Sequence, residues 1–372
     1  MFDVIVIGGN LAGASAAINA AAKGAIVALV ERNMEPFFPA HCGEGIDEFT
    51  LETYGLNKMD FSRNEIRKVI INIRSKEYFL ESKKHHAIIF DRNRVENELL
   101  KKAENEGVKL FLGISMRDFK SQYQIVLDNK KIINGRIIID ASGISCQVGR
   151  RIGMDTKLRK EDVGVCIQSR VVSNFNADTM KFWIHKPYAP FGYAYLFPHN
   201  EKMANIGLGV IGGQKLDLEK LLKNYINDMC GDKYKITSTF RACEPLASPM
   251  SRLIKDNVMI TGDAARLCNP TTGGGIRSAL FSGSLAGMIA GKYIQGEISS
   301  LEPYQEAMRN KILILRKAYT SKRKIESDKK YIRAYQRAVR RGCFINKLVP
   351  NLIQIVMEKT LVKDRYILES YR

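Results

Sequence analysis

Short apolar runs and an alanine-rich stretch alternate along the first 110 residues of the chain. The runs at 3–7 and 26–31 are continuous, which indicates strands buried on both faces. The stretch between them, 11–23, predicts a helix. A further helix is expected from Asp91, a typical N-cap residue, to Gly107, a typical stop. The chain therefore begins with a strand, helix, strand unit.

Further along, the pattern changes to strands of an antiparallel kind. Residues 67–90 alternate between apolar and polar, and residues 160–250 hold several runs rich in aromatic and β-branched side chains. We interpret the second group as a sheet inserted into the first domain. That domain resumes with a strand at 257–261 and a long helix after Gly275.

The last part of the chain is expected to be helical from about Tyr304, with interruptions at Gly342 and Pro350. Three regions are therefore predicted. They are a nucleotide-binding domain at 1–155 and 250–300, a sheet domain at 156–249, and a C-terminal helical region at 301–372.

A dinucleotide fingerprint follows the first strand. Gly8 permits the tight turn, Gly13 permits close approach of helix and strand, and Glu31 lies where it can accept hydrogen bonds from ribose hydroxyls. An acid there favours FAD or NAD over NADP. The fingerprint departs from the usual pattern at Asn10, which stands in place of the middle glycine. Asparagine tolerates positive φ, and its amide is able to donate to a phosphate.

A second string of glycines, at 207–212, matches the same pattern. It runs through an expected strand, and no strand with a terminal acid follows at the needed distance. We interpret it as sheet structure, so the chain offers one dinucleotide site.

The segment at 262–276 reads GDAARLCNPTTGGGI and indicates a flavin site. An aspartate follows a strand, and a triple-glycine turn opens a long helix of small residues. The free N–H groups at such a helix N-terminus can hold oxygen atoms of a ligand.

Composition adds one unusual number, a formal net charge of +19. Residues 301–372 hold 18 basic and 7 acidic side chains. Solvated helix faces explain such a bias, as does attraction to anionic lipid headgroups. No zinc-finger or other nucleic-acid-binding signature is present, so we expect no nucleic acid. The seven cysteines form no CxxC pair, so we expect no metal and a reducing cytosol. No basic leader precedes the first strand, so no signal peptide is expected.

Several segments, taken in order, resemble the geranylgeranyl reductase family of FAD-dependent oxidoreductases, and most closely its archaeal branch. The resemblance covers roughly residues 1–300. It is carried by the fingerprint with Glu31, His41-Cys42-Gly43-Glu44-Gly45, Phe90-Asp91-Arg92, Asp140-Ala141-Ser142-Gly143, Tyr193-Ala194-Tyr195-Leu196-Phe197-Pro198, and the GDAA segment. It implies an α/β fold with an α+β insertion: a Rossmann-like FAD-binding domain of the para-hydroxybenzoate-hydroxylase type, an inserted antiparallel sheet domain and a C-terminal helical region.

The resemblance also implies a set of cofactor contacts. Arg92 would pair with the diphosphate, Asp263 would bond ribityl hydroxyls, and Met116, at the end of the strand after the Asp91 helix, would contact adenine through its backbone. The full set of FAD contacts, with the fingerprint glycines, is Gly8, Ala12, Gly13, Glu31, Cys42, Gly43, Gly45, Arg92, Met116, Asp263, Gly275 and Ile276.

Catalysis is assigned by resemblance to Cys42, which would lie beside the isoalloxazine and deliver a proton to the alkene. The alternative is a small buried thiol, the commonest fate of a free cysteine. His41 departs from the family, which usually has proline there; it would lower the thiol pKa or cap a turn. The segment Tyr193, Tyr195, Phe197 and Pro198 would line a tunnel for an isoprenoid chain or would be core packing, and Tyr195 replaces a usual tryptophan.

The expected function is reduction of C=C bonds in geranylgeranyl chains of membrane lipids. The electron donor would be a ferredoxin-like protein or NAD(P)H, and the location cytoplasmic and peripheral to the membrane. The alternatives are an FAD-dependent aromatic monooxygenase and a membrane-associated electron-transfer flavoprotein.

Overall fold

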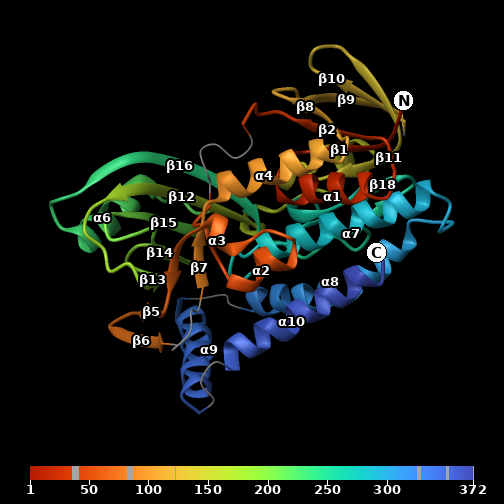
Figure 1. Ribbon diagram of the computed structural model, residues 1–372. Helices are drawn as coiled ribbons and strands as arrows, with labels where there is room; N and C mark the ends of the chain where they lie inside the picture. Colours follow the sequence, from red (N-terminus) through yellow and green to blue (C-terminus); the bar gives the residue numbers. More distant parts are fainter. Residues whose placement is uncertain (36–41, 82–86, 122, 325–327, 349–351, 372) are drawn as a thin grey trace.

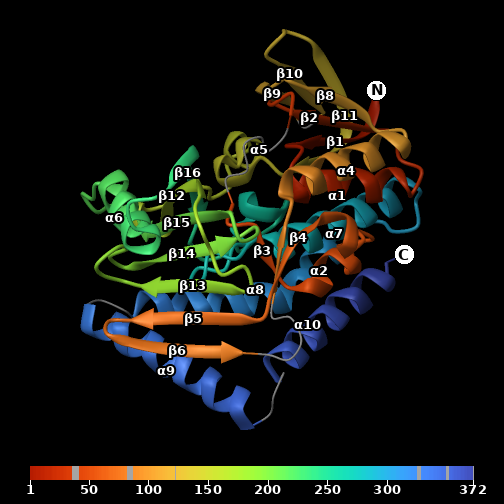
Figure 2. The same cartoon turned by 60° about the vertical axis from the view of Figure 1, so that its left-hand side comes forward.

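The computed structural model describes residues 1–35, 42–81, 87–121, 123–324, 328–348 and 352–371. His41 and Pro350, which the sequence analysis discussed, lie outside these residues. The architecture is mixed α/β, as expected, with two large sheets side by side and a layer of C-terminal helices beneath them (Figures 1 and 2).

The first sheet is built mainly of parallel strands in the order β17-β18-β11-β1-β2-β8, and β9 and β10 extend it from β11. These eight strands are β1 (Phe2–Ile7), β2 (Val27–Glu31), β8 (Lys109–Leu112), β9 (Met116–Ser121), β10 (Gln124–Leu127), β11 (Ile132–Asp140), β17 (Ile254–Lys255) and β18 (Val258–Ile260). β1 is fully buried from Val4 onward, which explains its uninterrupted run of β-branched residues.

Two helices rich in small residues pack closely against each other beside this sheet. α1 (Leu11–Ala21) and α7 (Ile276–Ile294) approach so closely that a Cβ on Gly283 would lie 2.1 Å from the carbonyl oxygen of Ala12. α4 (Arg92–Asn105) contacts α1. Asp91 caps α4 by accepting from the Arg94 amide at 3.1 Å, which confirms the predicted start of that helix.

The second sheet has the strand order β16-β12-β15-β14-β13-β5-β6. Its strands are β5 (Lys68–Ile73), β6 (Lys76–Glu81), β12 (Val163–Val172), β13 (Thr179–Ile184), β14 (Gly192–Pro198), β15 (Met203–Ile211) and β16 (Lys235–Pro245). The second glycine string lies within β15 up to Ile211, and only Gly212 follows the strand, in agreement with its interpretation as sheet. β5 and β6 come from the segment assigned to the nucleotide-binding domain, yet β5 pairs in parallel with β13 and so extends the second sheet. That sheet is therefore larger than the expected region 156–249.

Smaller elements connect the two sheets and complete the fold. The third sheet has the order β3-β7-β4, with β3 (Gly45–Ile46), β4 (Ser62–Ile66) and β7 (Ala87–Phe90). The short helices are α2 (Glu48–Thr53), α3 (Lys58–Phe61), α5 (Gln147–Arg151), η1 (Gly143–Ser145), η2 (Lys160–Asp162) and η3 (Gly262–Ala265), and α6 (Leu218–Cys230) covers one face of the second sheet.

The C-terminal region is helical, as expected, with α8 (Glu302–Arg323), α9 (Asp328–Leu348) and α10 (Leu352–Glu369). The predicted interruption at Gly342 is wrong, because Gly342 lies inside α9. A single glycine costs a helix only about 1 kcal/mol. No helix in the described residues is both long and apolar enough to cross a membrane.

Candidate flavin site

The turn after β1 has positions that only glycine can occupy. Gly8 has a φ of +102°, and a Cβ there would lie 2.4 Å from the carbonyl oxygen of Ala141. A Cβ on Gly13 would lie 1.8 Å from the carbonyl oxygen of Gly8. The tight turn and the close approach expected from the sequence are both present in the structure.

Asn10 is the N-cap residue of α1. Its φ is −72°, so the position requires no positive φ, and the tolerance of asparagine for that region does not explain its presence. Its Oδ1 accepts from the Ala12 amide at 3.1 Å, and its Nδ2 donates to the Ala141 carbonyl at 2.9 Å. One of the two N–H donors of the Asn10 amide, which the sequence analysis gave as able to donate to a phosphate, is thus bonded to the protein.

Glu31 ends β2 and is buried. One carboxylate oxygen accepts from the Gly9 amide at 2.8 Å and the other from the Asn33 amide at 2.9 Å. Each carboxylate oxygen retains a second lone pair. The acid is therefore fixed in place and keeps the capacity to accept from ribose hydroxyls.

The second cofactor segment runs from β18 through η3 into α7. Gly275 caps α7 with no side-chain hydrogen bond, and the described residues provide no partner for the amides of Gly275 and Ile276. The Asp263 carboxyl lies beside Gly275 without a hydrogen bond to any described residue. Burial raises the pKa of Asp263, and Arg92 opposes this rise. Free amides at a helix N-terminus next to a carboxyl acceptor form the donor and acceptor set that the carbonyl edge and ribityl hydroxyls of FAD require, so the residues fit that group.

Arg92 lies at the start of α4 and interacts with Glu96, Cys42 and Asp263. Its Nε and Nη2 donate to one oxygen of Glu96 at 3.1 and 3.0 Å. Burial works against the charged guanidinium, but Glu96 and the neighbouring Cys42 raise the pKa of Arg92 above its ordinary value. Burial also raises the pKa of Glu96 to about 7, against the influence of Arg92. Arg92, Cys42 and Asp263, which are far apart in sequence, are thus brought within electrostatic reach of one another.

Met116 is the cofactor residue whose expected place in the fold is wrong. It begins β9, whereas β8, the strand after α4, ends at Leu112. It is buried, and its register partner is Leu127 on β10.

The Cys42 loop packs directly against the second sheet. The Cys42 Sγ accepts from the Glu44 amide at 3.2 Å. A Cβ on Gly43 would lie 2.7 Å from the ring of Phe197 and 3.4 Å from that of Tyr195, and one on Gly45 would lie 3.0 Å from Phe197. These contacts explain the glycines on both sides of Glu44, because any side chain would push the loop away from the aromatic strand.

The alternating burial of β14 separates the four residues expected to line the tunnel. Tyr193, Tyr195 and Phe197 share one half-buried face, with ring centroids 6.2 Å apart for the first pair and 4.8 Å for the second. Pro198 lies at the alternate, buried position, and its carbonyl accepts from Asn64 at 2.8 Å. Successive strand residues point to opposite faces, so Pro198 does not share the aromatic face.

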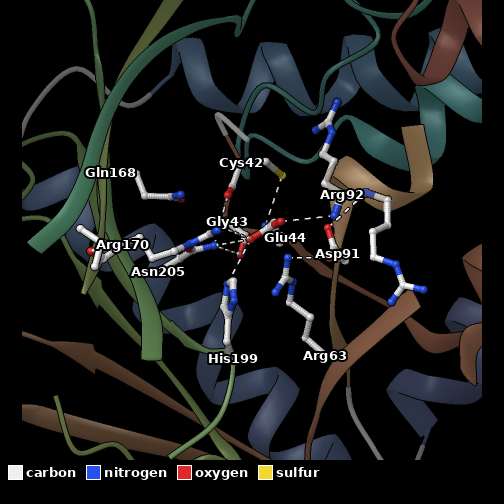
Figure 3. Close-up of polar contacts among 12 residues, drawn as sticks. Cys42, Gly43, Glu44, Arg63, Asp91, Arg92, Gln168, Arg170, His199 and Asn205 are labelled. Atoms are coloured by element: carbon white, nitrogen blue, oxygen red, sulfur yellow. Dashed lines mark hydrogen bonds and ion pairs between the residues drawn. The ribbon is translucent and has the colours of Figure 1, made fainter. Parts of the chain in front are cut away.

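Glu44 anchors the Cys42 loop to the second sheet, a role that the sequence analysis missed (Figure 3). Its Oε2 accepts from Asn205 at 2.7 Å and from Arg170 at 2.8 Å, and lies 3.0 Å from the Nε2 of His199. Its Oε1 accepts from the Arg92 amide at 3.2 Å. Burial alone would raise the pKa of Glu44, but His199, Arg170 and Asn205 together hold it below the ordinary value.

Glu244 is a second acid that the sequence analysis missed. It lies on β16, where its carboxylate oxygens are each 3.9 Å from a thiol, that of Cys166 or that of Cys268. A Cβ on Gly273, in the triple-glycine turn, would lie 2.7 Å from its Oε1. Burial and the nearby Asp263 raise the pKa of Glu244 to about 7. Its only sequence signal was a single acid in an alternating strand.

Two family models match consecutive parts of the chain. Residues 3–159 match the model described as glucose inhibited division protein A, and residues 162–243 match the geranylgeranyl reductase catalytic domain. The second match covers most of the sheet that carries the aromatic strand and Arg170.

Similar proteins agree with these matches. The digeranylgeranylglycerophospholipid reductase 1 of Methanopyrus kandleri is 30% identical over 82% of this chain and 85% of its own length. The reductase of the same name in Methanosarcina acetivorans is 30% identical over 82% of this chain and 79% of its own length. Among solved structures, a geranylgeranyl bacteriochlorophyll reductase-like protein of Thermoplasma acidophilum superposes with a TM-score of 0.82 at 23% identity, over 96% of this chain and 98% of that one.

A flavin-dependent brominase also shares the fold, with a TM-score of 0.69 at 16% identity over 100% of this chain and 98% of that one. The fold is thus common to flavoenzymes of different chemistry, and the family assignment comes from the sequence relatives and the catalytic-domain match. The chain belongs to the geranylgeranyl reductase family of FAD-dependent oxidoreductases.

Proposed function

We propose that this protein saturates C=C bonds in the geranylgeranyl chains of membrane lipids. The observation that carries the proposal is the contact between the Cys42-Gly43 loop and the aromatic face of β14. This contact supports the proposal because Cys42, which would lie beside the flavin, is in a loop that packs on the apolar rings that would bind the substrate. The names of the methanogen relatives support the same substrate class.

The cofactor contacts are part of the proposal. The α1 N-terminus with Gly8, Ala12 and Gly13 would face the pyrophosphate, and Glu31 the ribose. The free amides of Gly275 and Ile276 would hold the flavin pyrimidine edge, where the helix dipole of α7 favours negative charge. The other contacts expected from the family, at Cys42, Gly43, Gly45, Arg92, Met116 and Asp263, complete the set.

The chemistry divides between the cofactor and the chain. Reduced FAD, when bound, supplies a hydride to one alkene carbon. The Cys42 Sγ–H delivers a proton to the other carbon, and the sulfur keeps its hydrogen bond from the Glu44 amide afterwards. Glu44 positions this loop through Asn205 and Arg170, both on the sheet that carries the aromatic face.

The half-buried face of Tyr193, Tyr195 and Phe197 would bind the isoprenoid chain and exclude water from the reacting bond. The hydroxyls of the two tyrosines are turned to protein acceptors, since Tyr193 donates to the Thr272 carbonyl at 2.7 Å and Tyr195 to Gln168 at 2.7 Å. An apolar ring surface is left for the substrate.

The protein would act in the cytoplasm, at an anionic membrane surface, because its substrate is a lipid and its charge is +19. A ferredoxin-like protein or NAD(P)H would supply the electrons.

The test is anaerobic incubation of the dithionite-reduced holoenzyme with a digeranylgeranyl lipid, followed by mass spectrometry. We expect a gain of two mass units for each double bond reduced. Unchanged lipid mass would overturn the proposal. Oxygen consumption coupled to NADPH, with an oxygenated aromatic product, would instead identify a monooxygenase.

A further inference from the structure

Helix α9 has two faces of opposite character. With about 100° of rotation per residue, Tyr331, Ile332, Tyr335 and Val339 share one face. On the same count Arg333, Arg337, Arg340 and Arg341 centre roughly 180° away, on the other face. Burial agrees with this division, because Tyr331 and Ile332 are buried and the four arginines are exposed.

The aromatic face of α9 closes one side of the candidate site. The Tyr331 hydroxyl donates to the Gly192 carbonyl at the start of β14, at 3.1 Å. The Tyr335 hydroxyl donates to the Thr271 carbonyl, next to the triple-glycine turn, at 2.7 Å. The two rings lie 4.7 Å apart and belong to the same hydrophobic cluster as Tyr193. The helix is thus hydrogen-bonded both to the aromatic strand β14 and to the segment that leads into α7.

Within the described part of the chain, the arginine face of α9 has no acidic partners. None of Arg333, Arg337, Arg340 and Arg341 has a carboxylate within ion-pair distance among the described residues. The Arg340 Nε donates to the Tyr78 hydroxyl at 3.4 Å, on the β5–β6 hairpin. Phe79, the next residue on that hairpin, points to the opposite face of the strand from Tyr78, and the centroid of its ring lies 5.3 Å from the Nζ of Lys68. Exposed basic side chains gathered on one face of a helix whose other face is apolar are the combination that proteins use at anionic lipid headgroups.

Figures 1 and 2 place α9 at one end of the molecule, beneath β5 and β6, and place α4, β8 and β9 at the opposite end. We propose that the arginine face of α9 docks the protein on an anionic phospholipid surface, so that the aromatic wall behind α9 lies next to the bilayer. The inference rests on the proposed function, because it explains how a chain embedded in lipid reaches the site. It assigns membrane contact to one helix face rather than to the basic C-terminal region as a whole.

Vesicle binding by the full-length holoenzyme tests the proposal. The test variant is Arg333→Gln with Arg337→Gln and Arg341→Gln. Its control is Lys101→Gln with Lys109→Gln and Lys120→Gln, three exposed lysines on α4, β8 and β9 that cause the same loss of charge. Sedimentation is measured with phosphatidylcholine vesicles with and without phosphatidylglycerol.

The wild type and the control should bind the anionic vesicles, weakly at high salt, and should not bind the neutral ones. Each arginine near the surface contributes about fivefold in affinity, so the α9 variant should bind roughly a hundredfold more weakly. Equal binding by the two variants would overturn the assignment, as would equal binding of the wild type to both vesicle types. Binding of an acidic ferredoxin that depends on these arginines, without vesicle binding, would reassign the face to a protein partner.

A second measurement separates this proposal from the proposed function. The α9 variant should reduce detergent-dispersed geranylgeraniol as fast as the wild type does, and should lose turnover only on lipid embedded in anionic vesicles. If no protein reduces either substrate while the vesicle results hold, the proposed function fails and the docking surface stands. If the variant fails on the dispersed substrate as well, the face acts on the site itself and the docking assignment is overturned.

Discussion

The two halves of the site differ in what shapes them. On the proposed cofactor side, contacts between backbone atoms dominate. Glycines allow α1, α7 and the turn after β1 to approach one another closely, and the groups left available for a ligand are mainly backbone amides. On the proposed substrate side, contacts between side chains dominate: three rings lie on one face of β14, and Glu44 bonds the Cys42 loop to Arg170 and Asn205. Adding a single methyl group should therefore cost much stability on the cofactor side. On the other side, the loss of stability or activity should depend on the charge and volume of the side chain that is changed.

The largest effect is expected at Gly13. Gly13→Ala places a methyl group 1.8 Å from the Gly8 carbonyl oxygen, so the turn or the helix must move. We expect a loss of about 3 kcal/mol or more in the free energy of unfolding and purification largely without FAD. Calorimetry and the flavin absorbance measure both. Gly342→Ala is the matched control, because nothing lies within 4 Å of its added Cβ. It should be neutral or stabilising, and similar results for the two variants would break the comparison.

Cys42→Ala should leave flavin absorbance unchanged and lower turnover by about 100-fold, because a positioned proton donor contributes 10²–10⁴ to a rate. Anaerobic single-turnover reoxidation of the reduced enzyme by lipid substrate is the measurement. Cys243→Ala, at an exposed thiol on β16, serves as control. Full turnover by the Cys42 variant would remove this thiol from the chemistry.

Glu44→Gln tests the ion pair and hydrogen bonds by which the Cys42 loop is held against Arg170 and Asn205 of the second sheet. Removing one partner of a buried ion pair leaves Arg170 uncompensated, and we expect a loss of about 3 kcal/mol in the free energy of unfolding at pH 7. The pKa of Glu44 is lowered in the fold, so its contribution is present above about pH 4.5 and is lost on further acidification. The difference between wild type and variant should therefore shrink at low pH.

Glu219→Gln removes an exposed pair with Arg241 and should change stability by less than about 1 kcal/mol. If denaturant titrations give the two glutamine variants the same loss, Glu44 has no special role.

An effect smaller than that at Glu44, and of opposite sign, is expected at Glu244. Its pKa is raised to about 7, so the folded protein favours the neutral acid. Stability should fall as the pH rises from about 4.5 to 7 and then level off. Glu244→Gln should match the wild type near pH 4 and exceed it by roughly 1–2 kcal/mol at pH 8. Chemical denaturation of the holoenzymes across this range is the measurement, and parallel pH profiles would contradict the assignment.

Local signals in the sequence predicted the turn after β1 and the start of α4 well. Gly8, Gly13 and Glu31 stand at fixed distances along one strand, helix, strand unit, and Asp91 marks a helix start by its own side chain. In each case the physical cause lies within a few turns of the chain, so the sequence pattern carries it.

Features that depend on distant pairing were missed. No residue pattern in or near β5 predicts that it pairs with β13, which lies more than a hundred residues later in the chain. The roles of Glu44 and Glu244 are defined by side chains on other strands, and a lone acid in a strand has no distinguishing signal. The sequence prediction for 193–198 was nearly correct. Three of its four residues share one face of β14, and strand alternation alone, which is visible in the sequence, places Pro198 on the other face.

The N-cap at Asn10 has a consequence for how the cofactor is taken up. Its two hydrogen bonds, to Ala12 and Ala141, join the start of α1 to the loop after β11. Because these bonds lie within the protein, we expect the turn after β1 to lose little conformational entropy when a dinucleotide binds. Deflavinated protein should thus recapture FAD without refolding this turn, because the Asn10 side chain already bonds the start of α1 to the neighbouring loop.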